Sequence, residues 1–315
     1  MEILMHSTGV ITACSLAAAA SVIGVSVPAS WTLFGLTASI AIFGVPHGGL
    51  DHLTGRKLLA NRLPAIWPLV FFPGYLSVAL LVVVGWFLLP LATAVLFFVI
   101  SAWHFGLEDD RNRLKSKIID SIGAAAIGGL VIWIPMLTQP ERVGSILQSI
   151  VPSSLALSAS AIIETSQAIA CVLIPVAALV IARDAMRGEL SRASRNTSFI
   201  VLFAVTDVLI GFGVYFCGWH SIRGLARLAR DHEMNPLQLA SATAPLSLVA
   251  IGLAVLGMWF WSSGHGVSEA TSRTLFVALS AMAVPHVLLH GPITEVLMNS
   301  VLGCGESLET VEATT

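Results

Sequence analysis

Four histidines of this chain lie inside or beside apolar stretches, and each has glycine, tryptophan or proline as a neighbour in the sequence. Ionisable side chains at bilayer depth are costly, so several imidazoles in such positions indicate a functional site. Neutral imidazole binds iron, copper, zinc and nickel, and histidines from separate helices can converge in the core of a bundle. We therefore interpret the four as ligands of one metal ion. They lie in the segments Pro46-His47-Gly48, Trp103-His104-Phe105-Gly106, Trp219-His220-Ser221 and Pro285-His286.

Acidic residues follow two of these histidines at helical spacing. Asp51 comes four residues after His47, and Glu108 and Asp109 come four and five residues after His104. A carboxylate at that spacing can accept the second ring N–H of the histidine and fix its tautomer. Acids at these positions also mark a membrane surface, so both interpretations stay open.

The other histidines are weaker candidates. His52 comes five residues after His47, and five steps turn a helix by about 140°, so His52 should face elsewhere. His290 comes four residues after His286 and shares its face. That pair either supplies two ligands or, with glycine and proline directly after it, marks a helix end. Three further histidines fall in the N-terminus or in connectors, namely His6, His232 and His265.

The composition places these residues in a membrane protein. Of 315 residues, 56% are hydrophobic and 11% are charged, whereas a soluble domain has about 25% charged residues. The four cysteines form no CxxC or CxxCH spacing, which leaves zinc-finger, thioredoxin-like and c-type haem sites without support. The net charge of −2 carries no information about partners, and we expect no nucleic acid among them. The first apolar run has no Lys or Arg before it, which favours a retained helix over a cleaved signal peptide.

Nine stretches are long and apolar enough, or nearly so, to span a bilayer, which takes about 20 residues. The sequence therefore predicts an all-α, polytopic transmembrane helix bundle of about eight to nine helices. We expect residues 1–303 to form a single integral membrane domain and 304–315 to form a polar, disordered C-terminal tail. Five tryptophans near the expected helix ends are typical of an interfacial belt: Trp31, Trp67, Trp133, Trp259 and Trp261. The nine stretches are 8–27, 30–48, 66–89, 91–106, 118–137, 157–182, 198–219, 238–262 and 273–298.

The positions of Lys and Arg predict the orientation, because cytoplasmic loops carry most of them. If all nine runs cross, twelve basic residues lie on one face and four on the other. That topology places His220 at the membrane face opposite to His47 and His104, about 30 Å away. Either the histidines lie deeper than these boundaries, or the run 198–219, with Asp207 and two glycines, is interrupted. An interruption there divides the basic residues fourteen to two, so the charge rule prefers it.

Four motifs together resemble the Brp/Blh family of bacterial and archaeal membrane β-carotene 15,15′-dioxygenases. They are PHGGLDH at 46–52, WHFGLED at 103–109, YFCGWHS at 215–221 and VPH at 284–286, in that order along most of the chain. The resemblance implies a multi-pass enzyme of the cell membrane, an oxidoreductase in which histidines hold non-haem ferrous iron, Fe(2+). It implies that O2 and β-carotene, or a related carotenoid, are substrates and that cleavage of the central double bond gives two retinal molecules. By position, His47, His104 and His220 match the iron ligands of the family.

One position departs from the family pattern. The family usually has a further histidine four residues after the one at the position of His220, and this chain has Gly224 there. Glycine has no side chain to donate. Three alternatives stay open: a site with three protein ligands and water, a site that uses His286 with His290 behind it, and a chain with altered or lost cleavage activity. A Gly224→His variant is expected to show whether the missing ligand limits turnover.

Two other classes of protein also fit parts of the sequence. A transporter or ion carrier uses intramembrane acids and broken helices, for which Asp207, Glu164 and the glycine-interrupted run are candidates. An acid paired to a neighbouring helix fits Asp207 and Glu164 equally well. A membrane b-type cytochrome uses paired histidines as axial haem ligands and would show a Soret band.

Overall fold

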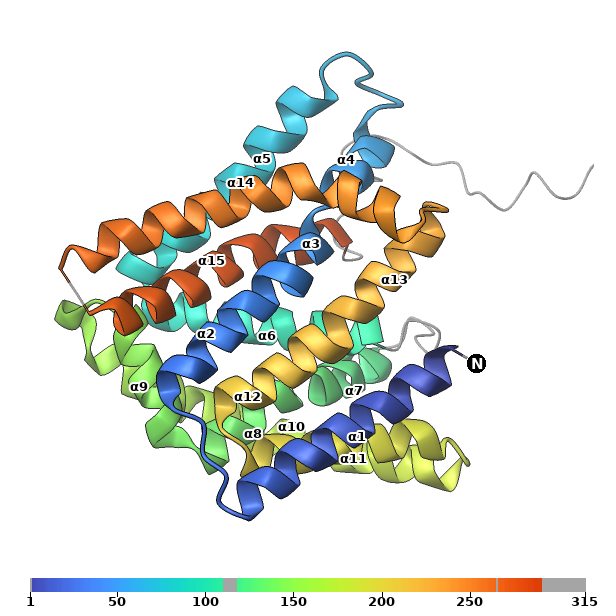
Figure 1. Cartoon of the computed structure of the whole chain (residues 1–315), viewed down its shortest axis with the longest axis vertical. Coiled ribbons are helices and arrows are strands. Elements are labelled where there is room, and N and C mark those ends of the chain that lie inside the picture. The colour runs from blue at the N-terminus through green and yellow to red at the C-terminus, as the bar shows by residue number, and fades with distance from the viewer. Residues whose placement is uncertain (1, 110–117, 265, 291–315) are drawn as a thin grey trace, which may run out of the picture.

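The computed structural model describes residues 2–109, 118–264 and 266–290. Every regular element within these ranges is a helix, which confirms the predicted all-α class. The long helices lie side by side in one bundle (Figure 1). The predicted C-terminal tail, 304–315, lies outside the described residues, and so does His265.

The helices follow the apolar runs but divide them at several points. Two π-helical segments, η1 (Ile40–Gly44) and η4 (Val214–Ser221), and one 3-10 segment, η3 (Ser153–Leu155), join the α-helices. The α-helices are α1 (Glu2–Val22), α2 (Ala29–Ser39), α3 (Val45–Gly48), α4 (Asp51–Leu59), α5 (Trp67–Leu88), α6 (Pro90–Asp109), α7 (Ile118–Gly128), α8 (Leu130–Thr138), α9 (Pro140–Ile150), α10 (Leu157–Met186), α11 (Leu190–Val205), α12 (Val208–Gly213), α13 (Ile222–Asp231), α14 (Pro236–Ser262) and α15 (Val267–His290).

The described residues contain six helices that are long and apolar enough to cross a membrane, or up to seven if one bent pair counts as a span. This is the build of a multi-pass membrane protein, with fewer spans than the eight to nine that the sequence predicts. The difference arises at α1, whose apolar part His6–Val22 is shorter than a span, and where two apolar runs are interrupted. The run 118–137 bends by 53° between α7 and α8, and the run 198–219 is divided between α11 and α12.

His47 lies deeper in its helix than the sequence boundaries place it. The elements α2, η1, α3 and α4 together form one candidate span, Ala29–Leu59, so the connector expected after residue 50 is largely helical. His220 likewise lies inside a helical run, because α12, η4 and α13 follow one another from Val208 to Asp231. π-helical turns within α-helices are frequent at functional sites, and η4 contains His220 itself.

The interruption between α11 and α12 is satisfied by polar groups of neighbouring segments. Asp207 caps α12, accepting from the backbone N–H of Leu209 at 2.9 Å, and pairs with Arg142 of α9 at 2.9 Å. The side-chain Nε2 of Gln139 donates to the carbonyl oxygens of Phe203 at 3.1 Å and Thr206 at 2.8 Å. Backbone groups exposed by a helix break at membrane depth need such partners. Asp207 therefore has a structural partner on a neighbouring helix.

Three arginines make specific polar contacts between helices. Arg227 of α13 pairs with Glu108 near the end of α6. Arg273 donates from Nε to the carbonyl oxygen of Ser149 on α9, at 2.7 Å, and Arg142 of α9 pairs with Asp207. The fourteen-to-two division of basic residues between the two membrane faces stays a prediction.

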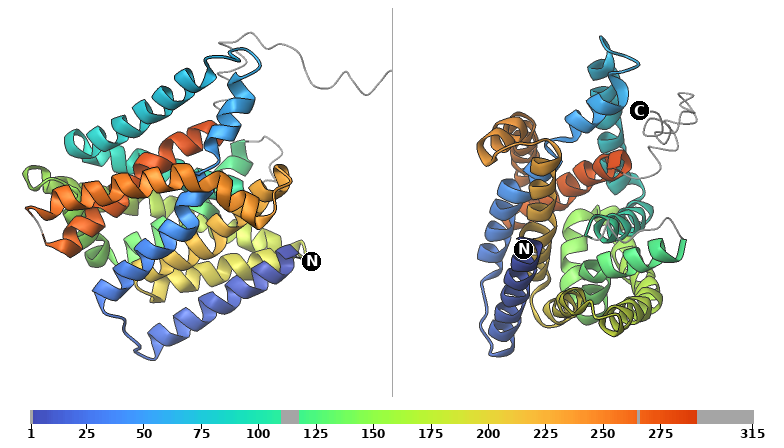
Figure 2. Two further views of the ribbon diagram at one scale, coloured as in Figure 1. Left: turned by 45° about the horizontal axis from the view of Figure 1, so that its top comes forward. Right: turned by 90° about the vertical axis from the view of Figure 1, so that its right-hand side faces the viewer.

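Helix α15 is the centre of the bundle. Of its apolar window, 61% is buried, compared with 11% for α5 and for α14. It packs against α5, α6, α9 and α14, and the right-hand view of Figure 2 shows α5, α6 and α14 around it. The residues of α15 consequently face the interior on several sides.

Candidate metal centre

The four histidines singled out in the sequence come together in the bundle, each from a different helical segment. His47 comes from α3, His104 from α6, His220 from η4 and His286 from α15, and all four are buried. Their rings form a closed cycle of neighbours. The ring centroids are 5.2 Å apart for His47 and His220, 5.4 Å for His220 and His104, 5.2 Å for His104 and His286, and 5.1 Å for His286 and His47.

The nitrogen atoms of three of these rings have the spacing of metal ligands. One ring nitrogen each of His47, His104 and His220 lies within 4.8 Å of the other two. Two imidazoles on one ion have nitrogens up to about 4.2 Å apart, since each metal–nitrogen bond is about 2.1 Å. Small side-chain adjustments would bring the three nitrogens to one ion.

The hydrogen bonding of the cluster also fits a metal ion. Among the described residues, both ring nitrogens of His47 and the Nε2 of His104 are buried without a hydrogen-bond partner. A buried polar atom left unpaired costs about 1–3 kcal/mol. A cation between the rings would supply the missing partner, so the residues present fit a metal held by neutral imidazoles.

Asp109 supports a histidine of another helix. Its carboxylate accepts from Nδ1 of His220 at 3.3 Å and from the hydroxyl of Tyr215 at 2.9 Å. With Nδ1 as the donor, the lone pair of the neutral His220 ring is on Nε2. The sequence offered Glu108 and Asp109 as partners of His104, and the structure places Asp109 against His220. Glu108 pairs with Arg227 instead, and the packing of η4 against α6 brings His220 to Asp109.

Asp51 supports His286 and not the nearby His47. Its Oδ1 accepts from Nδ1 of His286 at 2.8 Å and from Nε2 of His290 at 3.0 Å. Its Oδ2 accepts from the hydroxyl of Tyr75 at 2.8 Å. The expected pairing of Asp51 with His47 is wrong because α3 ends at Gly48 and α4 begins at Asp51, which interrupts the regular four-residue spacing.

The remaining histidines stay outside the three-ring group. His290 shares a face with His286, as predicted, and their ring centroids are 4.6 Å apart. Together with Asp51 these two form a separate group of close ligand atoms. His52 also lines the cavity, and its Nδ1 is 3.1 Å from the carbonyl oxygen of Gly49.

The two tyrosines were missed at the sequence level. The chain has only two tyrosines, and Tyr75 and Tyr215 each donate to a carboxylate that holds a clustered histidine. Tyrosine that rare, inside an apolar run, was a signal that its hydroxyl had a specific partner.

Gly224 lies directly against the ring of His47. A Cβ atom built at Gly224 would overlap Cε1 and Nδ1 of His47 and lie 3.0 Å from its Nε2. The position at which the sequence lacks a family histidine is thus the space that the ring of His47 occupies. A side chain at this position would displace His47, so the sequence-based expectation for Gly224→His needs revision.

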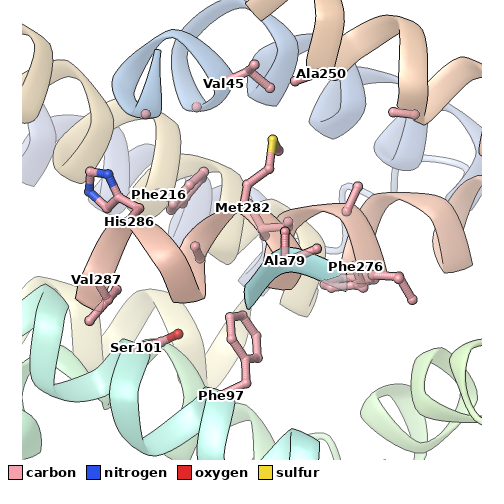
Figure 3. Close-up of a pocket in the computed structure, with 18 of the residues that line it drawn as sticks. Val45, Ala79, Phe97, Ser101, Phe216, Ala250, Phe276, Met282, His286 and Val287 are labelled. Carbon is pink, nitrogen blue, oxygen red and sulfur yellow. The ribbon is translucent and has the colours of Figure 1, made fainter. Parts of the chain in front are cut away.

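The histidines line a cavity of about 580 Å³ whose other walls are almost entirely apolar. Figure 3 shows His286 at one end of the view, Phe276 toward the other, and α15 crossing the cavity. The cavity extends along α15 as far as Thr274 and along α14 as far as Trp261. Apolar lining with a few convergent polar groups is typical of a site for an apolar ligand.

Comparisons with known proteins agree with this site. A family model described as beta-carotene 15,15'-dioxygenase matches residues 38–292. The chain is 27% identical to a probable beta-carotene 15,15'-dioxygenase Blh of Halobacterium salinarum, over 87% of this chain and 88% of that protein. It is 26% identical to a beta-carotene 15,15'-dioxygenase of the uncultured marine bacterium 66A03, over 80% of this chain and 90% of that protein. No solved structure matches the chain.

Proposed function

Because this chain belongs to the β-carotene 15,15′-dioxygenase family, we propose that it cleaves the central 15,15′ double bond of β-carotene with O2 to give two retinal molecules. The observation that carries the proposal is a cluster of four buried histidines that lines an apolar cavity in a membrane bundle. One carbon–carbon double bond is broken and two carbonyl groups form. Both atoms of O2 end in the two aldehydes, so the balance needs no further reductant.

We propose that His47, His104, His220 and His286 hold ferrous iron. The unpaired buried nitrogens of His47 and His104 support this assignment, and so does the neutral, all-imidazole character of the set. When bound, the ion would supply open coordination positions and the redox chemistry that the activation of O2 requires. His286 then takes the place of the ligand that the family has at the position of Gly224.

The surrounding residues orient these ligands. Asp51 and Asp109 each accept from the Nδ1 of one histidine, so they hold the Nε2 lone pairs of His286 and His220 on the opposite side of each ring. Each carboxylate is also bonded to a tyrosine hydroxyl. Both acids are thus engaged in positioning and are not available as acids or bases for the substrate.

The cavity walls hold the substrate and exclude water. Phe105 and Phe216 lie beside His220, with ring centroids 4.7 and 5.9 Å from the imidazole. Aromatic and aliphatic walls suit a polyene, which has no polar group to hydrogen-bond. β-Carotene dissolves in the bilayer, so a site inside a membrane bundle meets its substrate where the substrate is concentrated. We propose the cell membrane as the location.

The test is expression in bacteria that accumulate β-carotene. The wild-type chain is expected to bleach the orange colour and to produce retinal. His47→Ala, His104→Ala, His220→Ala and His286→Ala should each reduce both iron content and retinal formation. His232→Ala is the matched control, because His232 lies beyond the end of α13. Full iron content and full activity in all four cluster variants would refute the assignment.

A further inference from the structure

The cavity touches α15 on opposite sides. Ala278 and Val287 both line it and are nine residues apart, so they project in directions about 180° apart at 100° per residue. His286 projects between these two directions and also lines the cavity. Figure 3 shows Val45 and Ala250 on one side of α15 and Phe97 and Ser101 on the other. The cavity therefore has two compartments that meet at the histidines.

The part of the cavity between α15, α6, α8, α9 and α12 borders the core of the bundle, and we call it the inner compartment. Several of its lining side chains are buried, among them Val131, Met136, Val143, Leu147 and Leu209. They belong to the clusters that form the core of the bundle. An apolar chain that enters this compartment from the histidines is enclosed by protein.

The compartment between α15, α5 and α14 is open to the lipid side, and we call it the outer compartment. Leu76 and Leu80 of α5 line it and are 59% and 62% exposed. Val249 and Leu253 of α14 line it from the other side and are 59% and 60% exposed. A hydrocarbon dissolved in the bilayer can therefore reach the histidines from this side without crossing a polar surface.

The inner compartment ends at a fixed wall. Val143, Leu147 and Ile150 of α9 pack with Val277 of α15 in one buried cluster. Polar contacts fix α9 near both of its ends, from Arg142 to Asp207 at 2.9 Å and from Arg273 to the carbonyl oxygen of Ser149 at 2.7 Å. A helix fixed at two points cannot easily give way to a chain that presses against its centre.

The distance along α15 from the histidines to the α9 wall is close to the length of one half of a carotene. Val277 comes nine residues before His286, which is about 14 Å along α15 at 1.5 Å per residue. An extended carotene half, from the central double bond to its end ring, has this length. A longer segment would meet the wall before its reacting bond reached the histidines.

Building on the proposed function, we propose that the α9 wall of Val143, Leu147 and Ile150 selects the central double bond of the substrate. One half of the carotene fills the inner compartment and ends against this wall. The other half stays in the outer compartment, toward the lipid. The wall thereby determines which double bond lies at the histidines, so these residues set the cleavage position without touching the reacting atoms.

The test enlarges the wall and follows the products. Leu147→Ala lets the substrate slide deeper, so part of the product shifts from retinal to an unequal pair of apocarotenoid carbonyl products, one longer and one shorter than retinal. Leu81→Ala is the matched control, with the same truncation at an exposed position of α5 outside the cavity lining, and is expected to give retinal alone. Val143→Ala and Ile150→Ala repeat the test if Leu147→Ala does not fold. Retinal alone from folded wall variants would overturn the proposal, as would a shift in Leu81→Ala only.

A binding measurement separates this proposal from the proposed function. Retinol, a half-length probe, is added to the metal-free protein, and its binding is followed by quenching of tryptophan fluorescence, since Trp86 and Trp261 line the cavity. Leu147→Trp, which fills the inner compartment, should weaken binding about tenfold or more, and Leu81→Trp, outside the cavity lining, should not. Equal binding by the two folded variants would overturn the proposal. A wild-type chain that binds retinol in this way but cleaves no carotene would refute the proposed function alone.

Discussion

Gly224→Ala tests whether metal binding requires a glycine at position 224 to leave room for the ring of His47. The added Cβ would overlap Cε1 and Nδ1 of His47 and lie 3.0 Å from Nε2. Gly224 lies in the first turn of α13, and His47 lies in α3, which packs against α13. The helix backbone cannot move away without disturbing both elements, so the imidazole ring has to move.

The size of the required movement follows from the overlap. Carbon atoms in contact need about 3.5 Å, so relief of the overlap with all three ring atoms moves the imidazole by about 1 Å or more. Metal–imidazole bonds are about 2.0–2.1 Å long and tolerate deviations of about 0.2 Å. A displacement of 1 Å therefore removes His47 from the ligand set. Mutation of a residue that only hydrogen-bonds to a metal ligand typically lowers metal affinity about 10–100-fold. Since Gly224→Ala displaces a ligand itself, we expect a loss of about 100-fold.

The assay is iron content under buffered metal concentration, together with retinal formation. Gly218→Ala is the control, since Gly218 lies six residues earlier in η4 and a Cβ there has no atom within 4 Å. Alanine is favoured over glycine inside a helix, so Gly218→Ala should keep iron and activity. Gly224→His should behave like Gly224→Ala and not rescue a ligand. If Gly224→Ala binds iron as tightly as Gly218→Ala, the reasoning is refuted.

Three further variants test other parts of the structure. Asp51→Asn should lower iron affinity about 10–100-fold, because the amide cannot accept from two histidines and Tyr75 as the carboxylate does; unchanged affinity in an iron-binding titration would contradict this. Gly128→Ala should lower the melting temperature, because its Cβ would overlap backbone atoms of Gly106 and force α6 from α7, whereas an unchanged thermal transition would disprove the close packing. Asp207→Asn should leave retinal formation within about twofold, because asparagine also caps helices, and a large change in cation uptake would instead favour a transporter.

The sequence predicted the membrane class and the histidine cluster because both depend on local features. Long apolar runs with few charges form helices wherever they lie, and the settings of His47, His104, His220 and His286 are visible without a fold. The interruption of the run 198–219 was also readable, since an acid and glycines weaken a continuous helix. The described residues form that interruption between α11 and α12.

The aromatic belt shows the limit of such local reading. Trp31 and Trp259 are 67% and 70% exposed, as an interfacial belt requires. Trp133, which has the same kind of sequence setting, is fully buried and packs with Ala102 and Ala170. The bend between α7 and α8 turns its segment inward, and no feature of the surrounding residues specifies the direction of that bend.

What the sequence determined by itself was the set of clustered histidines, and what only the tertiary structure decided was the carboxylate partner of His220 and of His286. Asp109 reaches His220 across 111 positions, and Asp51 reaches His286 across 235. Such pairs depend on how each helix is rotated about its axis, and that rotation is set by packing across the whole bundle. The same packing turned Gly224 from an apparent missing ligand into the space that His47 occupies, and it divided the cavity on the two sides of α15.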